Sequence, residues 1–267
     1  MSSSSTPLRV AILECDTPVP PVLEKVGTYG DIFTALLKNA AAAVEEDVKK
    51  EGKSEQIAVQ TSTYDVVRDP DTYPKLDDID AVLITGSKHD SYRDFPWIVK
   101  LVDFTTEILK QDRVKLVGIC FGHQIIGRAL GVKVGPNEKG WEVAVTNFDL
   151  SEEGKKLFGL EKMRLQFLHR DIVHALPPSP SPLNPNASIG CIGGNSICEN
   201  MGMYSPGHFI TFQGHPEFTG LIISEIIKIR QAGGVFTDDM AQDFMSRAGI
   251  DHDGLLASKT IVKFLRG

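Results

Sequence analysis

A cysteine lies between two glycines in the stretch GICFG at 118–122, and this spacing favours a cysteine nucleophile. The apolar residues 114–119 predict a buried strand, and residues 122–130 predict the helix that follows it. A side chain at such a junction sits in a strained turn, which small neighbours permit, at the carboxyl edge of a parallel sheet. The helix N-terminus there favours the thiolate, the nucleophilic form. Cys120 alone would favour a buried core cysteine, but the flanking glycines and the downstream Gln124 disfavour that alternative.

A histidine and a carboxylate follow near the C-terminus in the stretch GHPE at 214–217. The residue before a proline favours extended geometry, and in an extended segment residues two apart point the same way. His215 and Glu217 are therefore expected on one side, with the carboxylate orienting one ring nitrogen and the other nitrogen facing the thiol. A Cys–His–carboxylate arrangement produces an activated nucleophile and a positioned proton carrier. Without the cysteine turn, this stretch would be interpreted as an ordinary turn.

A third stretch, Thr85-Gly86-Ser87, comes directly after the predicted strand 81–85. It is expected at the same sheet edge, because the carboxyl ends of parallel strands meet there. The backbone amides of Gly86 and Phe121 are candidates for holding the oxyanion of a tetrahedral intermediate. An ordinary strand-to-loop glycine is the competing interpretation of Gly86.

The rest of the chain predicts an α/β fold, an open and mostly parallel sheet flanked by helices. Hydrophobic strands alternate with amphipathic helices in the first half: strands 9–15, 57–67, 81–85 and 114–119, and helices 30–50, 96–110 and 122–130. Short runs in the second half predict antiparallel additions to the same sheet: 141–148, 163–168, 187–192 and 208–213. Three further helices are expected: 219–232, 238–247 and 254–265. We divide the chain into a disordered tail (1–7), one main domain (8–232) and a helical extension packed on it (233–267).

Composition limits the function classes. The chain has 267 residues and a formal net charge of −7, without a Lys/Arg cluster, which disfavours binding to nucleic acid or to a membrane surface. Four scattered cysteines, and the lack of a secretory signal or a long apolar run, lead us to expect a cytoplasmic protein. His169 and His174 lack a third ligand, and no glycine-rich phosphate loop is present, so we expect neither a metal nor another cofactor.

Together, GICFGHQ at 118–124 and GHPE at 214–217 resemble the motifs of the triad (class I) glutamine amidotransferases. ITGS at 84–87 and FLHRD at 167–171 fall where that family has its oxyanion and substrate loops. The resemblance implies a flavodoxin-like sheet and a γ-glutamyl thioester on Cys120. It also implies that Gln124 and His169 contact the glutamyl group of the substrate.

A closer resemblance is to the stand-alone γ-glutamyl peptidases of plants and their fungal relatives, through ITGSKHDSY, PWIVKL, GICFGHQ and FQGHPEF. The oxyanion loop lacks the second glycine and the proline of many synthetase-linked amidotransferases. We therefore expect a hydrolase of γ-glutamyl amides, acting on a small peptide or on glutamine. Two alternatives remain open: a glutaminase subunit that supplies ammonia to a separate synthetase partner, and a non-catalytic scaffold or redox sensor.

Overall fold

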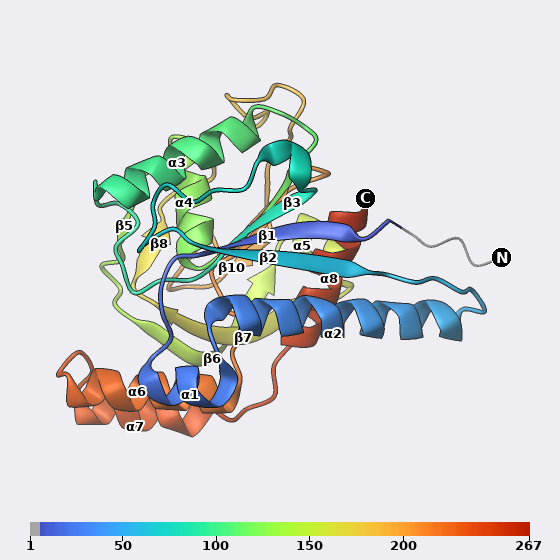
Figure 1. Cartoon of the computed structure of the whole chain (residues 1–267). Coiled ribbons are helices and arrows are strands. Elements are labelled where there is room, and N and C mark those ends of the chain that lie inside the picture. The colour runs from blue at the N-terminus through green and yellow to red at the C-terminus, as the bar shows by residue number, and fades with distance from the viewer. Residues whose placement is uncertain (1–5) are drawn as a thin grey trace.

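A mostly parallel sheet forms the centre of the protein, whose computed structural model describes residues 6–267 (Figure 1). The sheet has seven strands in the order β2-β1-β3-β4-β12-β11-β9. Their bounds are β1 Leu8–Glu14, β2 Val59–Asp65, β3 Ala81–Ile84, β4 Lys115–Ile119, β9 Gly190–Cys191, β11 Met203–Ser205 and β12 Phe209–Phe212. The first five strands in this order pair in parallel, while β11 pairs antiparallel with both β12 and β9. The carboxyl ends of β1, β3, β4 and β12 therefore meet at one edge.

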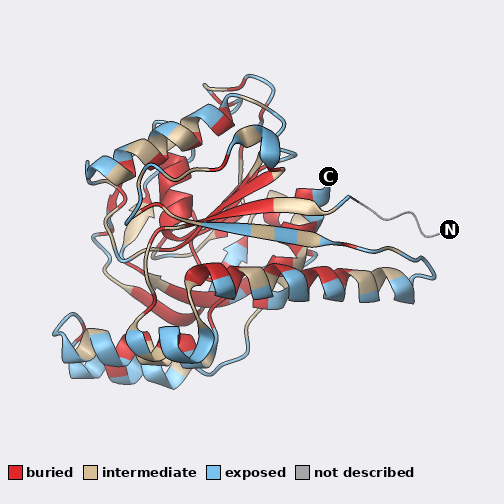
Figure 2. Cartoon of the chain, in the orientation of Figure 1, coloured by how far each residue is buried: buried red, intermediate tan, exposed pale blue. Residues whose placement is uncertain are grey.

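Helices cover both faces of this sheet, as the α/β pattern predicted. Their bounds are α1 Pro20–Val26, α2 Tyr29–Lys50, α3 Pro96–Leu109, α4 Phe121–Ala129, α5 Glu152–Phe158, α6 Gly220–Ala232, α7 Asp238–Arg247 and α8 Gly254–Arg266, with a short 3₁₀ turn at Leu76–Asp78. Successive residues of β1 belong to different hydrophobic clusters. Val10 and Ile12 pack with side chains of α2 and α8, whereas Ala11 and Leu13 pack with those of α3 and α4. Both faces of the central strands are consequently buried, while the edge strand β2 and the outer faces of the helices are exposed or half-buried (Figure 2).

The second half of the chain departs in detail from the sequence prediction. β6 (Glu142–Leu150) and β7 (Lys162–His169) form a separate antiparallel sheet with β10 (Gly193–Gly194), rather than joining the main sheet. β5 (Val134–Pro136) and β8 (Asp171–Val173) make a further antiparallel pair. β12 does belong to the main sheet, but it runs parallel to β4. An apolar run predicts a strand without naming its partner, and the fully buried β12 suits a central position.

The chain after residue 232 forms α7 and α8, which match the helices expected there. α8 buries most of one face against α2, and α7 packs on α6. The division at residue 232 stays a prediction, and the first five residues of the predicted tail lie outside the described residues. Across residues 6–267, no helix combines the length and the hydropathy needed to cross a membrane.

Candidate active site

Cys120 occupies a strained turn between β4 and α4. Its backbone has φ 51° and ψ −98°, a positive φ that side chains other than glycine rarely adopt. Its N–H donates to the carbonyl of Phe212 at 2.7 Å, which attaches the turn to β12. A Cβ on Gly122 would lie 2.3 Å from the carbonyl oxygen of Ile84, so only glycine allows the turn to pack this close to β3. The sequence prediction of a sharp strand-to-helix turn at Cys120 agrees with this geometry.

His215 and Glu217 lie just after β12, at the same edge of the sheet. His215 Nδ1 is 2.8 Å from Glu217 Oε1, and the imidazole stacks on Phe218 with 3.9 Å between ring centroids. The backbone turns here instead of continuing the strand as expected. The His215 N–H donates to the carbonyl of Gln166 in β7 at 2.8 Å, which holds the turn in place. The two side chains thus meet as predicted, although a tertiary contact rather than an extended segment brings them together.

Gly86 brings the loop after β3 against this histidine and the cysteine. A Cβ added to Gly86 would lie 2.9 Å from His215 Cε1 and 3.8 Å from Cys120 Cβ. The amide of Phe121 opens α4, where the first N–H groups of a helix have no intrahelical acceptor. The loop that holds Gly86 and the start of α4 therefore both adjoin Cys120, while the oxyanion role of the Gly86 and Phe121 amides stays a prediction.

The electrostatics around His215 favour its protonated form. Burial alone would lower the pKa of His215, but the neighbouring Glu217 and Cys120 outweigh burial and raise it. Nε2 of His215 has no hydrogen-bond partner among residues 6–267, so it is available to a substrate atom or to the sulfur. A protonated ring beside the sulfur stabilises the thiolate of Cys120, as in other Cys–His pairs.

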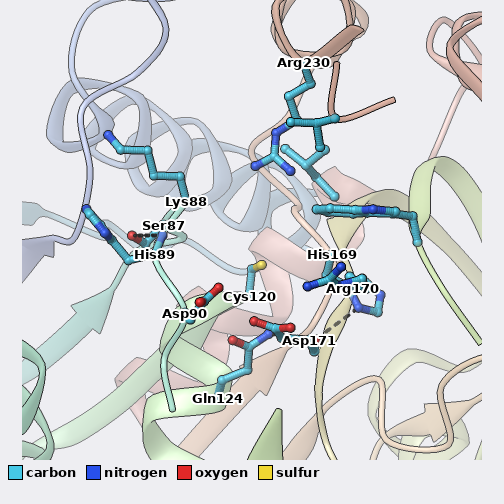
Figure 3. A pocket seen from close by; sticks show the side chains of 13 residues that line it. Ser87, Lys88, His89, Asp90, Cys120, Gln124, His169, Arg170, Asp171 and Arg230 are labelled. Carbon is cyan, nitrogen blue, oxygen red and sulfur yellow. Dashed lines mark hydrogen bonds between the residues drawn. The ribbon is translucent and has the colours of Figure 1, made fainter. Parts of the chain in front are cut away.

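Two cavities meet at Cys120. The first, of about 270 Å³, has a mostly polar wall (Figure 3). Its polar and charged lining residues are Ser87, Lys88, His89, Asp90, Gln124, His169, Arg170, Asp171 and Arg230. The second, of about 400 Å³, contains His215 and has a mostly apolar wall. That apolar wall is formed by Pro18, Val19, Pro20, Tyr29, Leu168, Phe218, Ile226 and Ile229.

The predicted substrate residues Gln124 and His169 both line the first cavity. The Gln124 carboxamide accepts from Ser91 Oγ and donates to the carbonyl of Asp171, both at 2.9 Å. His169 Nε2 lies 3.2 Å from Glu142 Oε2, and both side chains are almost fully buried. The contact of either side chain with substrate stays a prediction. Glu142 was not predicted, because it lies in β6 with no motif around it.

Three further residues, Gln213, Tyr29 and Arg230, contact Cys120 or line its cavities. Gln213 donates from Nε2 to the Cys120 sulfur at 3.5 Å. Tyr29 lines the second cavity and Arg230 lines both, and neither side chain has a hydrogen-bond partner in residues 6–267. Burial raises the pKa of Tyr29 and lowers that of Arg230, whose guanidinium lies 5.2 Å from the Trp141 ring centroid. Gln213 adjoins the GHPE motif and could have been noticed; Arg230 comes from α6 and carried no signal.

No group of three or more His, Cys, Asp or Glu side chains within residues 6–267 is arranged to hold a metal ion. The four cysteines are free thiols. At this edge of the sheet the Cys120 thiol and the oriented His215 imidazole both adjoin Gly86.

An open α/β sheet with a strained cysteine and a His–Glu pair at one edge defines the class of the triad-type amidotransferases. The family model "Glutamine amidotransferase class-I" matches residues 36–222, and the chain belongs to this family. A glutamine amidotransferase-like protein of Schizosaccharomyces pombe is 34% identical over 96% of this chain and 98% of its own. Gamma-glutamyl peptidase 3 of Arabidopsis thaliana is 35% identical, over 57% of this chain and 60% of its own length.

The fold is also shared with solved structures. A glutamine amidotransferase from Thermotoga maritima superposes with a TM-score of 0.70 at 16% identity, covering 98% of this chain and 100% of that one. At this identity the likeness establishes the fold alone.

Proposed function

We propose that this protein hydrolyses the γ-glutamyl amide bond of small peptides through a γ-glutamyl thioester on Cys120. The second cavity is the observation that carries the proposal. His215 lines this cavity and not the first one, and a leaving nitrogen protonated by His215 must lie on its side of the sulfur. The cavity of about 400 Å³ is far larger than departing ammonia requires, since a water molecule takes about 30 Å³ of liquid volume. A peptide leaving group matches this space.

The proposed reaction has two steps. In the first, the Cys120 thiolate attacks the γ-carbonyl carbon, and the amides of Gly86 and Phe121 stabilise the oxyanion. The C–N bond then breaks as His215 Nε2 gives its proton to the leaving nitrogen, which leaves a thioester. In the second, His215 takes a proton from water, the oxygen attacks the thioester, and the C–S bond breaks to release glutamate and the thiolate. Glu217 keeps the ring oriented throughout.

The first cavity suits the glutamyl end of such a substrate, which carries an ammonium and a carboxylate. Burial, and then the charge of Asp90, raise the pKa of Asp171, so this pair of acidic side chains favours a nearby cation. We place the ammonium against them and the rest of the glutamyl group beside Gln124 and His169. The guanidinium of Arg170 lies on the same wall and is available to the α-carboxylate.

The second cavity suits the leaving peptide. Its apolar wall, including Phe218 and Ile226, matches a cysteine side chain or an apolar group attached to the cysteine sulfur. Arg230 lines both cavities and has no acceptor in the described chain, so its planar guanidinium is available to a terminal carboxylate of the leaving peptide. The Tyr29 hydroxyl is available to a peptide group of the same ligand. Since the thiol must stay reduced to react, a cytoplasmic location fits this function.

Steady-state kinetics on the purified chain test the proposal, with γ-Glu-Cys-Gly, an S-alkylated form of it, and glutamine as substrates. We expect kcat/KM for the peptides to exceed that for glutamine by at least about tenfold, since one good hydrogen bond to a charged group is worth that much. Cys120→Ala is the matched control, and it should abolish turnover of all three. A preference for glutamine, or activity that appears only with a synthetase partner, would instead identify an ammonia-supplying subunit. If the protein cleaves none of the three substrates, the result would favour the non-catalytic alternative.

A further inference from the structure

A chain of carboxamides connects the backbone of one cavity wall to the Cys120 sulfur. Gln124 Nε2 donates one hydrogen to the carbonyl of Asp171 at 2.9 Å and the other to Gln213 Oε1 at 3.2 Å. Gln213 Nε2 donates in turn to the sulfur of Cys120 at 3.5 Å. Ser91 completes the chain by donating to Gln124 Oε1 at 2.9 Å.

The orientation of each carboxamide follows from the groups at the far end. A backbone carbonyl can only accept, so Asp171 requires the NH₂ group of Gln124 to face it. The second N–H of Gln124 then requires an oxygen opposite, which orients Gln213 with its own NH₂ group towards the sulfur. A flipped Gln213 would set two NH₂ groups against each other, with no acceptor between them. The network therefore aims a donor at Cys120, whichever way the cysteine itself rotates its hydrogen.

The carboxamides and the Cys120 sulfur are buried, so the direction of their hydrogen bonds matters for the sulfur. Ser91 and Gln213 have no exposed surface, and Gln124 and Cys120 are 4% exposed. An N–H···S contact in such surroundings competes with little water, so it favours a charged sulfur more than it would at the surface. The N–H of Gln213 approaches the sulfur from the side of β12 and α4. Gly86 and His215 approach Cys120 from the β3 loop and from the turn after β12.

We propose that Gln213 stabilises and orients the thiolate of Cys120, and that Gln124 acts through Gln213 as a positioning residue, held by Ser91 and the Asp171 carbonyl. This inference rests on the nucleophilic role given to Cys120 above. It assigns Gln124 a role that is complete without substrate, since its two N–H groups and its oxygen are already engaged.

The test measures the thiolate directly, without a substrate. The rate at which iodoacetamide alkylates Cys120, followed by mass spectrometry of the peptide that contains it, is recorded from pH 4 to pH 10. Gln213→Met removes the donor while keeping the length of the side chain. We expect the midpoint of the Cys120 profile to move up by about 1 to 2 pH units, as loss of a hydrogen bond to a charged group implies. Gln124→Met should move it in the same direction by less, because Gln213 stays in place but can flip.

Gln111→Met is the matched control. The Gln111 carboxamide bonds to backbone groups of Ile108 and Val114, away from the site, so its loss should lower stability without moving the Cys120 profile. The other charged or titratable groups that face the sulfur or line its two cavities are unchanged in these variants: Asp16, Tyr29, Lys88, His89, Asp90, His169, Arg170, Asp171, His215, Glu217 and Arg230. A difference between variants therefore reports the carboxamides.

The outcomes separate this inference from the proposed function. A folded Gln213→Met protein whose midpoint stays within about 0.3 pH units of the wild type would overturn the role of Gln213. If Gln213→Met does not fold, Gln124→Met decides alone. An unchanged Cys120 midpoint in Gln124→Met would then overturn the proposed carboxamide network. A shifted midpoint in a protein that cleaves no γ-glutamyl peptide would uphold the inference and reject the proposed substrate.

Discussion

Arg230→Met tests the direction in which the substrate lies across the sulfur. Methionine keeps an unbranched, apolar side chain that can still pack beside Trp141, where the guanidinium now lies 5.2 Å from the ring centroid. It removes the charge and the planar donors that Arg230 presents to the two cavities. If the terminal carboxylate of the leaving peptide binds Arg230, the variant should lose activity towards substrates that carry this carboxylate and towards few others.

The magnitude follows from the environment of Arg230. A hydrogen bond to a charged group contributes about 1.5–3 kcal/mol, and Arg230 as a whole residue is half-buried, so we take the lower part of this range. A loss of about 1.5–2 kcal/mol corresponds to a roughly 10- to 30-fold decrease in kcat/KM. The effect should appear mainly in KM, because the carboxylate is remote from the scissile bond and is bound equally in the ground state and the transition state.

The assay compares three substrates: γ-Glu-Cys-Gly, its C-terminal amide and glutamine. Only γ-Glu-Cys-Gly carries the leaving-group carboxylate. In wild type, the ratio of kcat/KM for this acid to kcat/KM for its amide should therefore equal the factor by which Arg230→Met lowers kcat/KM for the acid. The variant should treat acid and amide alike. An equal loss on acid and amide would show that Arg230 does not recognise this carboxylate. A comparable loss on glutamine would place Arg230 at the glutamyl end and reverse the assignment of the two cavities.

Four further outcomes are expected. Cys120→Ser should lower kcat by at least about 10³-fold while leaving the urea midpoint near that of the wild type, since its hydroxyl is a poor nucleophile here. Glu217→Gln should be roughly 10²-fold less damaging to kcat than Cys120→Ala, because Glu217 orients His215 and transfers no proton; equal losses would exclude this role. Gly86→Ala should reduce kcat roughly 10²-fold, since its Cβ would lie 2.9 Å from His215 Cε1 and displace the ring; near-normal turnover would rule out this close fit. Burial lowers the pKa of His215, but Glu217 and Cys120 raise it to about 10 from the ordinary 6.5. Because the folded pKa is the higher one, the stabilisation is complete below pH 6.5 and is lost as the pH rises towards 10. The free energies of unfolding of wild type and His215→Gln, measured in urea, should converge over that pH window. A difference that stays constant with pH would contradict the ion pair of His215 with Glu217.

Much of the fold was predictable because its signals are local. The strand at Leu8–Glu14 and the helix at Tyr29–Lys50 appear as continuous apolar and amphipathic patterns, and the structure has them within a residue or two. The turn at Cys120 was predictable for the same reason, since adjacent glycines and a strand-to-helix change lie within a few residues. The partners of β6 and β7 were not, because an alternating pattern defines a strand but not the strand it pairs with.

The residues of the candidate site also divide into those that the sequence predicted and those that only the fold brings to the site. The sequence by itself determined the chemical groups: a cysteine at a turn, a histidine and a glutamate two residues apart, and a glycine after a strand. Tertiary structure decided what surrounds them. Gln213 is 93 residues from Cys120, and Arg230 reaches the second cavity from α6. Arg230 carries no local motif, and the motif around Gln213 does not show its contact with Cys120, because both placements depend on the parallel pairing of β4 with β12 and on the packing of α6 near the sheet edge. The candidate nucleophile was therefore predictable from the sequence, whereas the contacts of its sulfur and the shape of the second cavity exist only in the folded protein.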